Sequence, residues 1–367
     1  MHNEVFESTP VVYAVGREYQ IFAPVKRPVV MWVRVGNEEF YDHSNGILRS
    51  DVTTHRIVVP MALLDEAGEY TVCYRIVNER LPYFSKLSEI YEYTSPFRAV
   101  RPDRPVHIYH LSDAHNRIET PSLAGGYFGE ELDLLVLNGD IPNHCGDICY
   151  FSAIHEIAAR VSKGQIPVVF SRGNHDTRGF AAEKLAEHTP TQNGRSYYTF
   201  RLGPVWGIVL DCGEDKPDAN PEYGFTVCFE HFRREETKFI RDCIERADEE
   251  YAAEGVKYRL AICHIPFSYN PPSPFNIEID TYTEWCRLLG EEIGVQLMLA
   301  GHQHKCYLSE VGSEYDHKGQ PCPVVVASRF EDDHLFVGGA ITLDKNTAHI
   351  AFTDNHGKVH EEHTLSL

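Results

Sequence analysis

Residues 166–176 read IPVVFSRGNHD, a short apolar run that is followed by Asn174, His175 and Asp176. A continuous apolar run of this length predicts a strand that is buried on both faces of a sheet. Consecutive polar side chains at the end of such a strand are costly unless water or a ligand satisfies them. The stretch therefore predicts a layered α/β fold with functional residues at its strand ends, where open α/β sheets bind ligands.

Four more apolar runs end in or contain polar residues of this kind: Asp113-Ala-His115, Gly139-Asp140, His264, and Gly301-His302-Gln-His304. Each has an ordinary explanation when taken alone, because a strand-end aspartate often caps a turn or a helix. A lone histidine in an apolar run is more often a satisfied core residue. Together, however, the five clusters offer carboxylate, amide and imidazole ligands, which is the chemistry of hydrolytic sites with about two metal ions.

The composition limits the classes of partner. The chain has 367 residues, of which 54 are acidic and 34 basic, and its formal net charge is -20. This charge argues against a nucleic-acid or anionic-membrane surface, because such surfaces need lysine and arginine to neutralise phosphates. A small phosphorylated substrate remains compatible, since bound metal cations would reverse the local field.

The chain shows no targeting or membrane segment. No run approaches the ~18 apolar residues that span a membrane, and residues 1–16 lack the basic and apolar regions of a signal peptide. The ten cysteines show no paired CxxC spacing, so neither a zinc ribbon nor a disulfide framework is predicted. We expect a cytoplasmic protein with reduced thiols, and removal of a leader peptide is the open alternative.

The N-terminal part differs in character from the rest. Its β-branched and aromatic runs are separated by turn residues, as is typical of a β-sandwich. These runs are 29–35, 55–61 and 69–77. The stretch from Asp65 to Tyr70 looks like the tyrosine corner of immunoglobulin-like and fibronectin-like domains, and the proline-rich segment 97–105 suits a linker. We predict two domains, an all-β sandwich over 1–100 and an α/β domain over 105–367.

In chain order the five clusters read DxH, GD, GNHD, H and GHxH. This pattern resembles the signature of the calcineurin-like metallophosphoesterase superfamily, and the resemblance covers residues 106–356, about two thirds of the chain. It implies a four-layer α/β/β/α sandwich for the second domain. It also implies a hydrolase that uses two divalent metal ions such as Mn, Fe or Zn.

The resemblance further implies roles for individual residues. The first ion would be held by Asp113, His115 and His304, the second by Asn174, His264 and His302, and Asp140 would bridge both ions. His175 would contact the phosphate or protonate the leaving alkoxide, with Asp176 orienting it.

Four neighbouring residues are candidate substrate contacts. Arg172 and Arg178 flank the GNHD cluster and could clamp a phosphate. Asn143 and His144 follow the bridging aspartate and could line the pocket. For each of the four, an ordinary surface or loop role is the alternative.

A sandwich followed by a metallophosphoesterase domain is similar to the architecture of purple acid phosphatases. Those enzymes have a tyrosine three residues after the bridging aspartate, where this chain has Asn143, and usually a glycine where it has His115. We therefore expect a metal site of the broader DxH group, without the colour of an iron–tyrosinate.

The expected reaction is hydrolysis of a phosphate ester by in-line attack of metal hydroxide, with His175 assisting the leaving group. A phosphodiesterase that acts on nucleotides or phospholipid head groups is the alternative, and a non-catalytic binding scaffold is a remote one. In the loop 266–282, the aromatic residues Tyr269, Phe275 and Tyr282 could stack a base or simply pack the loop. Substrate, metal identity and oligomeric state remain open.

Overall fold

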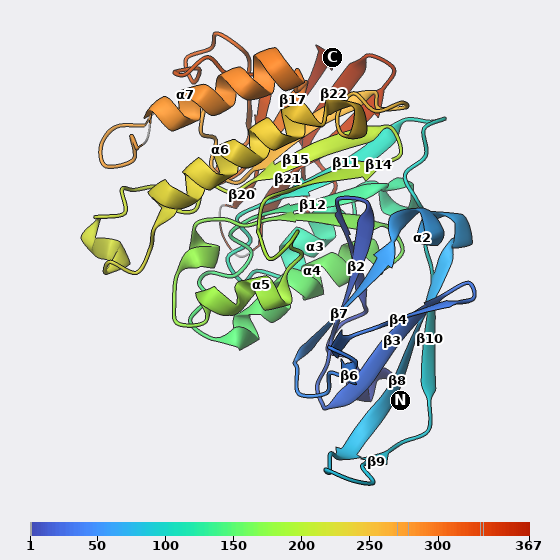
Figure 1. The fold of residues 1–367 in the computed structure, drawn as a ribbon. Helices are drawn as coiled ribbons and strands as arrows, with labels where there is room; N and C mark the ends of the chain where they lie inside the picture. The colour runs from blue at the N-terminus through green and yellow to red at the C-terminus, as the bar shows by residue number, and fades with distance from the viewer. Residues whose placement is uncertain (1, 270, 278, 331, 333) are drawn as a thin grey trace.

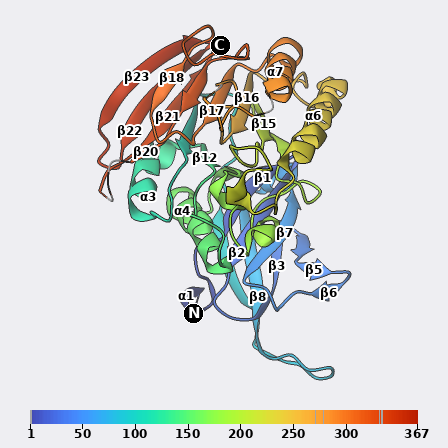
Figure 2. The ribbon, with the colours of Figure 1, turned by 90° about the vertical axis from the view of Figure 1, so that its left-hand side faces the viewer.

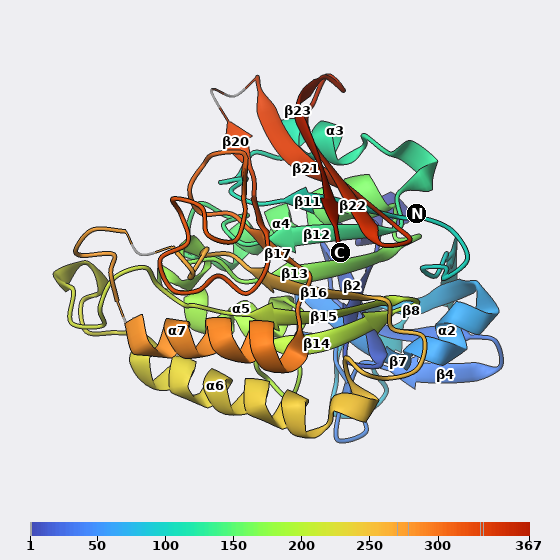
Figure 3. The same ribbon diagram turned by 90° about the horizontal axis from the view of Figure 1, so that it is seen from above.

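The computed structural model describes residues 2–269, 271–277, 279–330, 332 and 334–367. Two sheets lie face to face, and helices cover the outer face of each (Figures 1 and 3). Helices α6 (Phe229–Glu245) and α7 (Ile279–Arg287) lie outside one sheet, and α3 (Glu119–Gly125) and α4 (Ser152–Ser162) lie outside the other. The fold is therefore mixed α/β, with its helices on the outside.

The larger sheet has the strand order β23-β22-β21-β11-β12-β13-β1-β2-β7. Its parallel centre consists of β11 (Val106–Leu111), β12 (Leu134–Asn138) and β13 (Pro167–Ser171). Every residue of β12 and β13 is buried, which explains why these strands are continuous apolar runs. The C-terminal strands extend this sheet beyond β11, and each pairs antiparallel with its neighbour; they are β20 (Arg329–Phe330), β21 (Phe336–Asp344), β22 (Thr347–Asp354) and β23 (Val359–Ser366).

The smaller sheet has the order β14-β15-β16-β17-β19-β18. Its strands are β14 (Tyr198–Leu202), β15 (Val205–Leu210), β16 (Tyr258–Cys263), β17 (Leu297–Ala300), β18 (Tyr307–Ser309) and β19 (Val324–Val326). Strands β15, β16, β17 and β19 run parallel. The carboxyl ends of β16 and β17 therefore meet at one edge of the sheet.

The N-terminal strands continue the larger sheet, and Figure 2 shows them at the opposite side from the C-terminal strands. Strand β1 (Val11–Val15) pairs in parallel with β13, and β2 (Glu18–Pro24) and β7 (Thr54–Pro60) follow it. A separate N-terminal sheet has the order β10-β8-β3-β4. Its strands are β3 (Val29–Val35), β4 (Glu38–Tyr41), β8 (Glu69–Glu79) and β10 (Tyr91–Pro96). The N-terminal region is thus mainly β structure, and it shares a sheet with the α/β region.

Tyr70 corrects the prediction of a tyrosine corner. Residues Met61–Ala67 form the helix α2 just before it, and Gly68 ends this helix with a φ of +66°. The Tyr70 hydroxyl donates to the backbone carbonyl of Gly164 at 3.0 Å, in the turn between α4 and β13. In a tyrosine corner the partner lies a few residues upstream, so here the hydroxyl instead connects the N-terminal region to the α/β region.

Short elements complete the fold: α1 (His2–Val5), α5 (Leu185–His188), β5 (His43–Ser44), β6 (Ile47–Leu48) and β9 (Lys86–Leu87). In the described part of the chain, no helix has the length and apolar character that a membrane crossing needs.

Candidate metal centre

The five polar clusters of the sequence meet at the carboxyl ends of strands from both sheets. Asp113, Asp140 and Asn174 lie two or three residues after β11, β12 and β13 of the larger sheet. His264 and His302 lie one or two residues after β16 and β17 of the smaller sheet. The face-to-face packing of the sheets therefore brings together residues as distant in the chain as Asp113 and His304.

The backbone is left-handed at five candidate ligands, where φ is positive although none is glycine. These are Asp113 (+56°), His115 (+45°), Asp140 (+53°), His302 (+69°) and His304 (+51°). A non-glycine residue rarely adopts this conformation, and such residues gather at functional sites when the surrounding structure holds them there. The clustering of these unusual backbone conformations indicates a functional site at this edge of the sheets.

Two glycines allow the loops to approach closely. A Cβ atom on Gly173 would lie 2.3 Å from Asp140 Oδ1, and one on Gly301 would lie 1.8 Å from Ser112 Oγ. No larger residue fits at either position without displacing a neighbouring loop.

Asp113, His115 and His304 form the first group of converging ligand atoms. His115 Nε2 lies 3.0 Å from His304 Nε2, which in turn lies 3.4 Å from Asp113 Oδ1. Nitrogen ligands lie about 2.0–2.1 Å from a zinc ion, so two of them on one ion are roughly 3.0–3.4 Å apart. The spacing of these three side chains therefore fits a divalent ion.

Asp140, His264 and His302 form a second group. His264 Nε2 lies 3.1 Å from Asp140 Oδ2. The Asn174 side-chain amide lies 2.9 Å from His302 Nδ1, so its oxygen can join this group as a neutral ligand. Carboxylate, imidazole and amide groups that converge in this way fit a metal ion.

The carboxyl group of Asp140 belongs to more than one group of converging atoms. It lies with His264 and His302 in one group and with His115 and His175 in another. His115 also belongs to the group of Asp113 and His304. Asp140 therefore lies between the two candidate ion positions.

The electrostatics of the centre favour cation binding. Burial by itself would raise the pKa of the Asp140 carboxyl group. The nearby histidines, above all His264, have the larger effect and lower this pKa. Burial lowers the pKa of His115 and of His302 to about 4. Burial also opposes the charging of His264, yet Asp140 and Asp113 raise the pKa of its imidazole to about 10. Ionised carboxylates beside the neutral imidazoles of His115 and His302 are the protonation states that metal ligands require, whereas His264 has to release a proton when an ion binds.

Backbone contacts orient the ligands. His264 Nδ1 lies 2.7 Å from the backbone carbonyl of Asn138, so it donates there and directs Nε2 toward Asp140. The Asp113 carboxylate accepts from the Ser112 hydroxyl at 2.6 Å and from the His302 backbone nitrogen at 3.0 Å. Such contacts fix the orientation of metal ligands in proteins.

His175 lies at the centre, but its orientation does not come from Asp176. His175 Nδ1 lies 2.8 Å from the backbone carbonyl of Asn143, and Nε2, on the other side of the ring, lies 3.5 Å from Arg178 Nη1. The Asp176 carboxylate instead accepts from the backbone nitrogens of Gly173 at 2.8 Å and Asp140 at 3.1 Å. Burial and the charge of Asp140 raise the pKa of Asp176 to about 8. Asp176 thus connects two loops. The backbone carbonyl of Asn143, and not Asp176 as expected, orients the ring of His175.

The four candidate substrate contacts lie in different environments. Arg172 Nε pairs with Asp211 at 2.7 Å, and its guanidinium lies over the rings of Phe229 and Phe232. The side chain of His144 is exposed and packs against Tyr150, away from the ligand groups. Asn143 contributes its backbone carbonyl to His175, as described above.

Arg178 is held by an acidic residue that the sequence interpretation missed. Its Nε and Nη2 donate to Glu214 at 2.6 and 2.7 Å, and its Nη1 lies 3.5 Å from His175 Nε2. The neighbouring Asp215 lies 3.5 Å from His302 Nε2. Both acids follow the end of β15, so the same pattern of polar residues after an apolar run could have indicated them.

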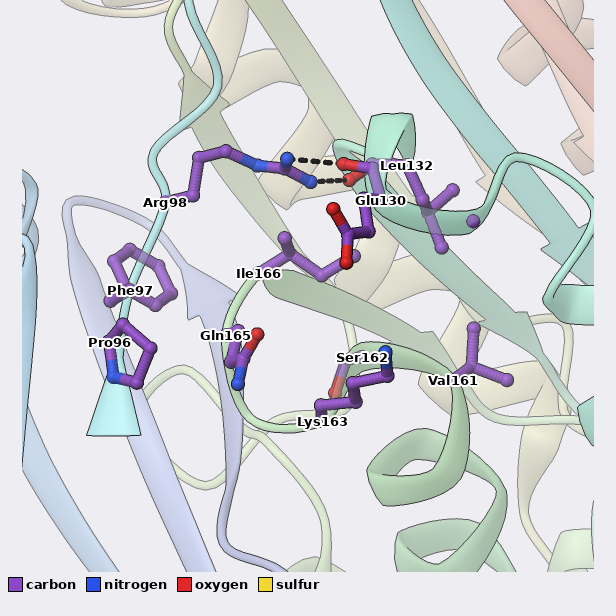
Figure 4. Close-up of a pocket in the computed structure, with 11 residues that line it drawn as sticks. Pro96, Phe97, Arg98, Glu130, Leu132, Val161, Ser162, Lys163, Gln165 and Ile166 are labelled. Atoms are coloured by element: carbon purple, nitrogen blue, oxygen red, sulfur yellow. Dashed lines mark hydrogen bonds between the residues drawn. The ribbon is translucent and has the colours of Figure 1, made fainter. Parts of the chain in front are cut away.

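Two hollows lie near these elements, and only one reaches the centre. A cavity of about 330 Å³ is lined by His302 together with Asp215, Phe267 and Tyr282. A second hollow lies between the linker residues Phe97 and Arg98 and the turn after α4, and Figure 4 shows Arg98 donating to the carbonyls of Glu130 and Leu132. None of the candidate ligands lines this second hollow, so it is separate from the metal centre.

Comparison with known proteins agrees with this geometry. A family model described as calcineurin-like phosphoesterase matches residues 106–306. The purple acid phosphatase PPD1 from yellow lupin (Lupinus luteus) seeds has a similar structure, with 13% identity, a TM-score of 0.62, and coverage of 98% of this chain and 74% of that chain. PhoD is also similar, with 11% identity, a TM-score of 0.58, and coverage of 98% of this chain and 90% of that chain. At these identities the likeness concerns the fold alone. A comparison with curated protein sequences found no match.

Proposed function

This chain belongs to the calcineurin-like phosphoesterase family, and on that premise we propose that it is a phosphoric ester hydrolase that depends on two divalent metal ions. The observation that carries the proposal is the position of Asp140, whose carboxyl group lies between two groups of ligand atoms. A carboxylate shared in this way is the usual bridge of two-metal sites.

The proposed ligands of one ion are Asp113, His115 and His304, those of the other are Asn174, His264 and His302, and Asp140 is shared. Two divalent ions held there would polarise the phosphoryl oxygens and make water a stronger nucleophile. The residues of the chain would make the other contributions to catalysis: they orient the reacting groups, donate a proton and place a positive charge beside the phosphate.

His175 is the proposed proton donor to the leaving alkoxide. The contact of Nδ1 with the Asn143 carbonyl fixes the plane of the ring, and Nε2 lies beside Arg178 Nη1 at 3.5 Å. A proton on Nε2 can then pass to the alkoxide as the bond between phosphorus and oxygen breaks. Asp176 acts on the loops that carry Gly173 and Asp140, and through them on the position of His175.

Arg178 is the proposed contact for a phosphate oxygen. Glu214 engages its Nε and one N–H of Nη2, and Nη1, 3.5 Å from His175 Nε2, is the proposed donor to the substrate. Arg172 is committed to Asp211 and to two aromatic rings, so we assign it a structural role.

We further propose that residues 1–100 form an immunoglobulin-like or fibronectin-like sandwich that precedes the phosphoesterase domain of 105–367. The sheet β10-β8-β3-β4 and the strands β2 and β7 share one apolar core, to which Val33, Tyr74 and Ile57 belong. Because β1 pairs with β13, we expect this sandwich to need the rest of the chain for its stability.

The experiment that tests the function measures hydrolysis of p-nitrophenyl phosphate and bis-p-nitrophenyl phosphate. The protein is stripped with a chelator and reloaded separately with Mn, Fe, Co, Ni or Zn. Asp140→Asn should lose bound metal and turnover, and the matched control Asp242→Asn, at an exposed position of α6, should keep both. The preferred ester decides between a monoesterase and a diesterase, which is the alternative function. Absence of bound metal in the parent protein would refute the proposal.

A further inference from the structure

The cavity beside the metal centre has an aromatic wall. Phe267 and Tyr282 are stacked, with ring centroids 5.7 Å apart, and the indole of Trp285 packs edge-on against both rings at 5.4 Å. All three side chains are buried. A wall built in this way is rigid, so it can hold a flat group against it.

A buried lysine lies in the same cavity. Lys318 is 8% exposed, its Nζ donates to the backbone carbonyl of Tyr269 at 3.1 Å, and it lies 5.7 Å from the ring centroid of Tyr282. Within the described ranges, no carboxylate pairs with this ammonium group. Burial lowers the pKa of Lys318, as is usual for a cation that lacks a counter-charge.

The remaining charges of the cavity do not compensate Lys318. Lys305 adds a second cation to the lining. Among the described residues that line the cavity, Asp215 is the acidic one. Its carboxylate already pairs with Lys216 at 3.2 Å and lies 3.5 Å from His302 Nε2. Among the described residues, the lining of the cavity therefore combines a candidate metal ligand, an aromatic wall and a positive charge without a paired carboxylate.

We propose that this cavity binds the leaving group of the phosphoester and selects an aromatic alcohol that carries an anionic group. The inference rests on the proposed function and names its substrate class. The phosphate lies at the metal centre, the ring packs against Phe267 and Tyr282, and the anionic group accepts hydrogen bonds from Lys318. A cationic alcohol, such as the head group of a choline phospholipid, is disfavoured because it would be buried beside Lys318.

The volume of the cavity agrees with this class of ligand. At about 330 Å³, it is near the lower end of the range for small-molecule sites, which starts at roughly 300 Å³. One substituted aromatic ring fits such a space.

Three aryl phosphates test the inference: phenyl phosphate, 3-carboxyphenyl phosphate and 3-(aminomethyl)phenyl phosphate. On the metal-loaded protein, kcat/KM is measured for each ester, and the ratio of the carboxylate ester to the amine ester is compared between variants. Intrinsic reactivity cancels, because each protein is tested on the same pair. Lys318→Met should lower this ratio by about tenfold or more, the effect of one charge-assisted hydrogen bond. The control Lys238→Met, at an exposed position of α6, should leave it unchanged.

A calorimetric titration with 3-hydroxybenzoate and 3-(aminomethyl)phenol gives a reading that does not depend on catalysis. It uses protein without metal ions, so that the carboxylate cannot bind to a metal. The parent protein should bind 3-hydroxybenzoate at least tenfold more tightly than the amine. Equal binding of the two, or an unchanged ester ratio in a folded Lys318→Met or Lys318→Gln variant, would overturn the inference.

The two measurements separate the possible failures. A protein that hydrolyses phenyl phosphate but shows no preference for the anionic probes refutes the assignment of the cavity and retains the proposed function. A protein that hydrolyses no phosphoester but binds 3-hydroxybenzoate through Lys318 refutes the proposed function and retains the anion-selective cavity.

Discussion

Gly173 lies against the carboxyl group of Asp140, and alanine at this position should disable the candidate metal centre. A Cβ atom on Gly173 would lie 2.3 Å from Asp140 Oδ1 and 2.5 Å from the Asp140 backbone nitrogen. Ordinary contacts begin at 3.4 Å, so the carboxyl group must move by about 1 Å. Ligand distances in metal sites hold to about 0.2 Å, and the displacement is several times larger. Because Asp140 is the proposed shared ligand of the two ions, both ions should be lost.

The assay separates metal affinity from stability. Competition with a chromophoric chelator should show metal binding to Gly173→Ala at least ~100-fold weaker, a larger loss than the roughly 10–100-fold cost of disturbing residues that only support the ligands. Urea denaturation in chelator should show a loss of about 1–3 kcal/mol in the free energy of unfolding, which is the usual cost of overpacking. At a metal concentration ~100 times the Kd, the parent protein should gain about 2.7 kcal/mol, and the variant should not.

Gly339→Ala is the matched control. Gly339 lies in β21, its φ is not positive, and an added Cβ would meet atoms no closer than 3.7 Å. This variant should bind metal as the parent protein does. If Gly173→Ala bound metal within twofold of Gly339→Ala, the close approach of the two loops would have no importance for the site, and the reasoning would be refuted.

Three further changes test other contacts of the structure. Arg178→Met leaves the buried Glu214 without its partner and should lower the free energy of unfolding in urea by about 3 kcal/mol. Combining Arg178→Met with Glu214→Gln should recover more than half of this loss. If the losses of the two single variants simply added in the double variant, the pairing would be contradicted. Burial lowers the pKa of His155 from 6.5 to about 4, so its neutral form stabilises the fold above pH 6.5 and the stability falls by up to ~3 kcal/mol as the pH drops toward 4. His155→Gln should flatten this part of the curve of stability against pH, and an unchanged slope would refute the assignment. His175→Ala should lower kcat by about 100-fold or more while the metal content stays constant, and full turnover would exclude His175 as the proton donor.

The sequence alone was enough to predict the class of fold and to identify the residues of the candidate centre, because both depend on local patterns in the chain. Apolar runs such as 132–140 and 166–176 predict buried strands whatever lies next to them. A polar residue directly after such a strand must lie at the edge of a sheet, so the order of residues in the chain is enough to identify Asp140 and Asn174 as candidate ligands. Apolar residues at helical spacing in 151–162 and 230–250 likewise predict helices, and α4 and α6 lie there.

Tertiary structure alone decided which groups meet, because these contacts join segments that are distant in the chain. Tyr70 reaches Gly164, 94 positions away, in place of a carbonyl within its own region. Arg178 forms an ion pair with Glu214, a partner that the local sequence did not indicate. The Asp176 carboxylate accepts from the backbone nitrogen of Asp140 instead of orienting the ring of His175. The spacing of residues along a strand says which face a side chain occupies, but its partner depends on how the two sheets pack. The residue types of the centre are therefore fixed by the local sequence, and their hydrogen-bond partners are fixed by the packing of the two sheets.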